Sequence, residues 1–132
     1  MNFFIRKNST YPKLEYTLTQ KIREKYNITD EMLENVAITF SMIDSDSGLY
    51  YIANVPANIE YKKIRPQYPN EITYILNYKF KLSDTHKTGR YSGEFVIDFI
   101  NTQITNCLKL KLPVDEEINI IISDSITKTT VI

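Results

Sequence analysis

The sequence contains no tryptophan, one cysteine, one histidine and only three glycines among its 132 residues. A single cysteine excludes a disulfide within the chain, which fits assembly in a reducing cytoplasm. One histidine and one cysteine cannot build a typical zinc site, and three isolated glycines leave no glycine-rich loop for phosphate. The composition therefore predicts no metal and no cofactor.

An excess of either charge is also missing, since 16 Lys and Arg balance 16 Asp and Glu. Nucleic-acid-binding domains normally carry a basic excess, so nucleic acid is an unlikely partner on this count. No apolar run approaches membrane-spanning length, and the first residues are too short an apolar stretch for a signal peptide. We expect no membrane partner and, without a candidate reaction site, no small-molecule substrate.

The charges are nevertheless grouped along the chain. Residues 30–60 carry six acidic and no basic residues, whereas residues 61–90 carry seven basic and two acidic residues. Patches of opposite sign on a neutral protein favour docking on copies of itself or on a partner of mixed charge. The alternative is that folding intermixes the two groups. On the first interpretation, a homo-oligomer is the expectation.

The longest regular pattern runs from Thr73 to Phe99. Its two arms alternate apolar and polar residues, which predicts two half-buried strands. A polar segment ending at Gly89 separates them, so we expect a central antiparallel hairpin. The predicted buried residues are Tyr74, Leu76, Tyr78, Phe80 and Leu82 on the first arm and Tyr91, Gly93, Phe95, Ile97 and Phe99 on the second.

Shorter alternating segments before and after this pair bring the total to seven or eight strands. With at most one short helical turn, beginning near Thr29, this spacing predicts an all-β domain over residues 1–132. We expect an immunoglobulin-like antiparallel sandwich, with a small barrel as the alternative. Residues 44–48 (D-S-D-S-G) predict a polar hairpin turn. Pro56 is expected to begin a mostly exposed connection reaching residue 70, with room for a short strand around residues 59–64.

No catalytic group of residues can be assembled from the sequence. His86 lies in a predicted polar turn, Cys107 lies in another segment, and nothing suggests a third residue to orient them. Glu94 and Asp98 share a strand face but stand about 13 Å apart, too far for a carboxylate pair acting on one bond. The chain is therefore not expected to be an enzyme.

Two aromatic segments are candidate partner-binding surfaces, because exposed large aromatics often anchor interfaces. One is at the N-terminus, where one of the two phenylalanines is expected to fill the core instead. The other is the basic and aromatic run Y-K-K-I-R-P-Q-Y, for which we favour a protein partner over single-stranded nucleic acid. The candidate residues are Phe3, Phe4, Tyr61, Lys62, Lys63, Arg65 and Tyr68.

Four segments carry a family resemblance in order and spacing. They are F-F-I-R-K-N-S-T-Y-P-K-L-E-Y-T-L at residues 3–18, V-A-I-T-F-S-M at 36–42, D-T-H-K-T-G-R-Y-S-G-E-F-V-I-D-F at 84–99 and the stretch from Leu112-Pro113 to Ile122. The sequence resembles the N-terminal immunoglobulin-like domain of phage upper baseplate proteins and related tail proteins. The loop at residues 20–35 is longer and more charged than this pattern.

The resemblance implies a non-enzymatic virion protein of a tailed phage, made in the host bacterial cytoplasm. Its expected role is a tail or baseplate adaptor that contacts tail, portal-ring, fibre or capsid subunits. Family members continue into a receptor-binding region, which this sequence lacks, so an anchoring role is expected. A capsid-decorating or head-fibre protein is one alternative, and a small intracellular regulator or enzyme is another. The motif residues expected to be structural are Pro12, Leu14, Gly89, Tyr91, Glu94 and Phe95.

Overall fold

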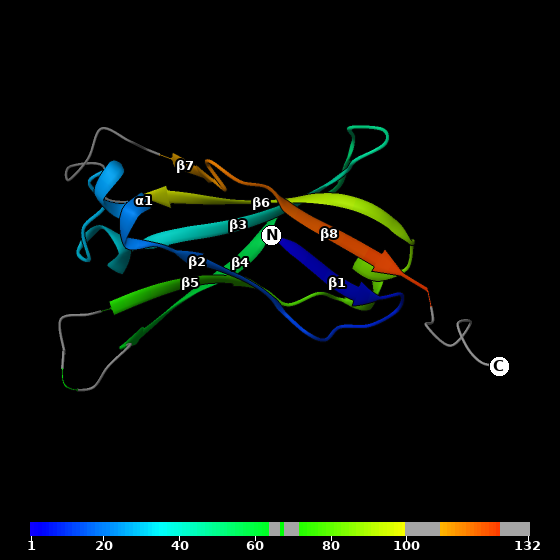
Figure 1. Cartoon of the computed structure of the whole chain (residues 1–132), viewed down its shortest axis with the longest axis horizontal. Helices are drawn as coiled ribbons and strands as arrows, with labels where there is room; N and C mark the ends of the chain where they lie inside the picture. The colour runs from blue at the N-terminus through cyan, green and yellow to red at the C-terminus, as the bar shows by residue number, and fades with distance from the viewer. Residues whose placement is uncertain (64–66, 68–71, 100–108, 125–132) are drawn as a thin grey trace.

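The computed structural model describes residues 1–63, 67, 72–99 and 109–124, in which eight strands form one nearly barrel-shaped sheet (Figure 1). The all-β prediction is confirmed. The strands are β1 (Asn2–Arg6), β2 (Leu14–Leu18), β3 (Val36–Asp44), β4 (Tyr50–Lys63), β5 (Ile72–Tyr78), β6 (Gly89–Phe99), β7 (Lys109–Leu112) and β8 (Ile118–Ser123).

The strand order is β1-β8-β6-β3-β4-β5-β2, and β7 pairs with the end of β6 beyond β8. β1 runs parallel to β8, and every other pair is antiparallel. β4 pairs with β3 through its first half and with β5 through its second half. This long strand therefore forms the corner at which one wall of the sheet becomes the other.

The predicted central hairpin is wrong. β5 pairs with β4 and β2, whereas β6 pairs with β3, β7 and β8, so the two arms lie on different walls. The alternation itself is largely confirmed, because four of the five predicted positions on β5 and its extension, and all five on β6, are buried. Leu82 is exposed because the 3-10 helix η2 (Leu82–Thr85) begins there. Asn77, on the opposite face of β5 from the predicted buried positions, is also buried and donates to Glu60.

The strand break predicted at Pro56 is also wrong, since β4 continues through Pro56 to Lys63 and so includes most of the short strand expected at residues 59–64. The register between β3 and β4 shifts twice between Phe40 and Ile43, and Asn54 of β4 has a positive φ of 51°. Such bulges bend a strand and tolerate proline beside them. By contrast, the predicted polar turn at 44–48 is present, with Asp44 Oδ1 accepting from the amides of two turn residues.

The core is built around the ring of Phe40, which is fully buried on β3. Its centroid lies 4.5 Å from that of Tyr78 on the β5 wall and 5.1 Å from that of Phe95 on β6. Phe80 meets the same ring edge-on at 6.1 Å. Stacked and edge-to-face rings at these separations are favourable beyond their buried area, so one aromatic cluster joins both walls.

Helical structure is more extensive than the one turn predicted. α1 (Gln20–Lys25) begins after Thr19, whose hydroxyl accepts from the Ile22 amide, and η1 (Met32–Glu34) follows. Thr29, the predicted helix start, accepts from the Met32 amide. We call residues 20–35 the helical arm. It is anchored by the buried side chains of Ile28, Met32 and Leu33, which local sequence signals did not identify.

A substitution at Gly93 would test the packing between β6 and β8. A Cβ atom there would lie 2.9 Å from Ile120 Cδ1 and 3.1 Å from Ile118 Cγ2. We expect Gly93→Ala to lower the free energy of unfolding by about 1–3 kcal/mol through overpacking, measured by urea unfolding. Ser92→Ala on the opposite strand face is the control, with a change within about 0.5 kcal/mol. Equal stability of Gly93→Ala and wild type would contradict the register.

Candidate functional site

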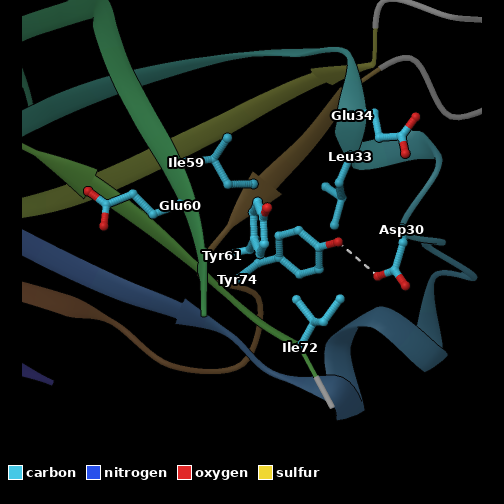
Figure 2. A pocket seen from close by; sticks show the side chains of 8 residues that line it. All are labelled: Asp30, Leu33, Glu34, Ile59, Glu60, Tyr61, Ile72 and Tyr74. Carbon is cyan, nitrogen blue, oxygen red and sulfur yellow. Dashed lines mark hydrogen bonds between the residues drawn. The ribbon is translucent and has the colours of Figure 1, made fainter. Parts of the chain in front are cut away.

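A pocket of about 690 Å³ lies between the helical arm and the hairpin formed by β4 and β5 (Figure 2). Figure 2 shows two tyrosine rings side by side in its centre, with aliphatic side chains around them. The carboxylates lie further out. The lining residues are Asp30, Leu33, Glu34, Ile59, Glu60, Tyr61, Ile72 and Tyr74.

Strand pairing positions the two tyrosines. Tyr61 of β4 and Tyr74 of β5 are direct cross-strand partners, so their side chains leave the sheet on the same face. Their ring centroids are 6.4 Å apart. Tyr74 is buried, whereas Tyr61 is 67% exposed. The hairpin therefore presents one fixed ring and one open ring to the pocket.

The arm is attached to this hairpin through one carboxylate. Asp30 Oδ1 accepts from the Tyr74 hydroxyl at 2.8 Å and from Arg23 Nη2 at 2.5 Å. The Arg23 guanidinium carbon also lies 4.8 Å from the centroid of the Tyr74 ring, a cation–π geometry. Arg23 Nε is buried and has no hydrogen-bond partner among the described residues. Tyrosine, carboxylate and guanidinium thus close the inner side of the pocket.

This environment raises the pKa of Tyr74 from 10.0 to about 12. Burial is the largest cause, because it penalises the phenolate, and the hydrogen bond to Asp30 and its negative charge add to it. Glu34 also raises this pKa, so its charge acts on the phenol, while Arg23 opposes the rise. Tyr74 is therefore a neutral hydrogen-bond donor at physiological pH.

The three lining carboxylates differ in what they already bind. Asp30 is engaged by the arm, and Glu60 Oε1 accepts from Lys13 Nζ at 3.3 Å and from Asn77 Nδ2 at 3.1 Å. The Glu34 carboxylate has no hydrogen-bond or ion-pair partner within the described part of the chain. Among the lining residues that the structure describes, none is Lys or Arg. The pocket is thus apolar and aromatic, with one available negative charge.

The structure brings only part of the predicted Tyr61–Tyr68 surface to this pocket. Tyr61 lines it. Lys62 is exposed one position further along β4, where strand alternation turns it to the other face, and Lys63 ends the strand. Arg65 and Tyr68 lie outside the described residues. The remaining predictions for this run are not tested.

The N-terminal phenylalanines separate as expected. Phe3 is half-buried and stacks on Phe80 with ring centroids 5.7 Å apart, whereas Phe4 is 63% exposed. Phe4 borders a second, smaller hollow with Tyr11, whose side chain is 82% exposed. Only Phe4 remains available as a partner-binding residue on this strand.

The six motif residues lie on or just before strands β2 and β6. Leu14, Tyr91 and Phe95 are buried in the core. Glu94 faces outward and its carboxylate lies 3.9 Å from Lys111 Nζ. Gly89 has a φ of 150° at the start of β6, and Pro12 follows a cis peptide bond just before β2.

His86 is engaged locally rather than in a cluster. Its Nδ1 lies 2.8 Å from the Tyr51 hydroxyl and 2.7 Å from the Ser83 carbonyl oxygen. Cys107 is outside the described residues. Within the described ranges, no three His, Cys, Asp or Glu side chains gather as metal ligands. Of the helices described, none is long and apolar enough to span a membrane.

Comparisons with known proteins gave no match: no family model, no curated protein and no solved structure is similar to this chain.

Sequence reasoning identified Tyr61 but missed the rest of the pocket. Tyr74 was assigned to the core by its alternation, which is correct for its ring but does not reveal the hydroxyl bond to Asp30. Asp30 was read as the first turn of a helix. Asp30 and Tyr74 are 44 residues apart along the chain, so local sequence does not predict their contact. The acidic group at residues 30–60 was the one feature that pointed to negative charge in this region.

The raised tyrosine pKa values predict loss of stability in alkali. The pKa of Tyr16 is also raised to about 12, chiefly by burial. Because the folded pKa exceeds the unfolded value of 10.0, this contribution is present below pH 10 and is lost as pH rises towards 12. We expect the urea midpoint to fall over this range, and to fall less in Tyr74→Phe. An equal fall in Tyr74→Phe and wild type would contradict the assignment for Tyr74.

Proposed function

We propose that this chain is a non-enzymatic protein-docking module, a structural component of a tailed-phage virion that serves as a tail or baseplate adaptor. The proposal combines the motif resemblance with two features of the molecule. One is an immunoglobulin-like strand order, and the other is a pair of exposed aromatic surfaces. Its localisation would be the virion, after synthesis in the host cytoplasm.

The strand order supports an immunoglobulin-like reading. Taking β2, β3, β5 and β6 as strands B, C, E and F, the sheet reads B–E on one wall and F–C on the other. β4 then supplies C′ with its first half and D with its second, and β7 with β8 supplies the last strand G. The nearly closed shape follows from β4 serving both walls without a break.

The observation that carries this reading is the environment of Tyr91. It lies near the start of β6, is 1% exposed, and donates its hydroxyl to the Lys87 carbonyl oxygen at 2.8 Å. A buried tyrosine at the start of strand F, bonded to backbone a few residues upstream, is the tyrosine corner of immunoglobulin-like domains. Tyr91 belongs to the motif at residues 84–99 on which the resemblance rests.

Exposed aromatic residues support docking to protein partners. Tyr61 and Phe4 lie on strands at separate parts of the sheet and are each more than 60% exposed, at 67% and 63%. Large aromatic side chains of this kind are enriched at the centres of protein interfaces. The chain therefore has two separate surfaces for neighbours, as an adaptor requires.

The function is tested by incorporation into particles. We expect the triple variant Tyr61→Ala, Arg65→Ala and Tyr68→Ala to keep a Tm near that of wild type, because Tyr61 lies mostly outside the core. Its incorporation into purified particles, measured by mass spectrometry, should be abolished. Tyr50→Ala, a comparably exposed tyrosine on β4 (57%), is the matched control.

The partners recovered decide the location in the particle. Co-purification of the wild-type chain with tail and portal-ring proteins supports the adaptor role. Recovery with the major capsid protein would instead favour the head-decorating alternative. Normal incorporation of the triple variant would exclude the Tyr61–Tyr68 surface, and absence of the wild-type chain from particles would overturn the virion proposal.

A further inference from the structure

We infer that the pocket between the helical arm and the β4–β5 hairpin binds an arginine side chain from a partner polypeptide. The inference rests on the proposed docking role of this surface but not on the location in a virion. It is carried by the shape, the apolar walls and the charge of the pocket.

The walls suit the long apolar stem of such a side chain. Leu33, Ile59 and Ile72 line the pocket around the two tyrosine rings. Arginine and lysine both lay their methylene groups on apolar surface and keep the charged end in contact with polar groups or water. An entirely apolar guest would remove the Glu34 carboxylate from water without pairing its charge, which is energetically costly.

The charge of the lining selects a cation. The three charged residues in the described lining are acidic, and two of them already bind cations that come from outside the lining, Arg23 and Lys13. Glu34 is the carboxylate left without a partner in the described part of the chain. An anionic guest would meet like charge at the arm.

An arginine of the chain itself already makes, beside the pocket, the kind of contact proposed for the guest. Arg23 lies over the ring of Tyr74 and binds Asp30, which combines one tyrosine face with one carboxylate. Tyr61 and Glu34 offer the same two groups again, this time open to a partner. Arginine is favoured over lysine because its planar guanidinium stacks on aromatic rings and binds carboxylates through two donors.

Among the described residues, Arg90 and Arg6 of a second copy are poor sources of this arginine. The backbone of Arg90 bonds to Ser45, which brings the turn containing Asp44 and Asp46 beside it. Arg6 faces Ser123 in the parallel pair of β1 and β8, next to Asp124. Either of these two arginines would carry carboxylates towards an acidic pocket, which favours a different polypeptide as the source of the guest.

The test is an NMR titration of the full, ¹⁵N-labelled chain with three short peptides that differ only at the central residue. The peptide Gly-Ser-Arg-Ser-Gly, blocked at both ends, is compared with its citrulline and lysine counterparts. Citrulline keeps the shape of arginine and lacks its charge. We expect saturable shifts at pocket amides with the arginine peptide, weaker binding at higher salt, and little binding of citrulline.

Two variants locate the contact. Glu34→Gln and Tyr61→Ala should each weaken arginine-peptide binding by roughly two- to five-fold, the size expected of an exposed ion pair or cation–π contact. Glu31→Gln is the matched control, because Glu31 is an exposed acidic neighbour that does not line the pocket. An unchanged spectrum away from the pocket verifies that each variant is folded.

The outcomes separate this inference from the proposed function. Equal binding of citrulline, shifts elsewhere on the molecule, or no shifts with the arginine peptide would overturn the arginine assignment. Chemical-shift changes at pocket amides that appear on raising the protein concentration alone would show that a second copy occupies the pocket. That result would contradict the assignment of the guest to a different polypeptide. Particle incorporation is measured independently of peptide binding. If the arginine peptide does not bind but incorporation still requires Tyr61, the arginine assignment is wrong and the docking role stands.

Discussion

The contact between Phe40 and Tyr78 is the interaction on which the rest of the structure depends. Phe40 belongs to the wall built from β3 and β6, Tyr78 belongs to the wall built from β2 and β5, and their rings stack at 4.5 Å. The walls share only one strand, β4. Aromatic packing across the interior therefore sets the separation of the walls, and the sheet closes around it as far as β1 and β2.

The pocket is a consequence of this closure. Because β4 crosses from one wall to the other, its second half pairs with β5 away from β3, and the helical arm covers the face that this leaves. Asp30 fixes the arm by bonding both Tyr74 and Arg23. The open side retains Tyr61 and Glu34, whose carboxylate has no partner among the described residues. A docking surface thus forms where the core packing ends.

Local pattern was enough for the strands but not for their partners. Alternation identified the buried faces of β5 and β6, because a period of two reports burial directly. The polar segment ending at Gly89 predicted that the two strands pair with each other, but pairing is decided by contacts between distant segments. Pro56 was read as a strand end since a bulge at Asn54 leaves no clear local signal. The arm–hairpin contact was missed for the same reason, because Asp30 and Tyr74 meet only in the folded chain.

The strand order is the central claim, since both the immunoglobulin-like reading and the pocket depend on it. The most direct measurement is the set of Hα–Hα nuclear Overhauser contacts between strands in the labelled protein. The account predicts contacts of β6 with β3 and of β5 with β4 and β2, where antiparallel pairs bring backbones closest. Contacts between β5 and β6 would restore the simple hairpin and contradict the account.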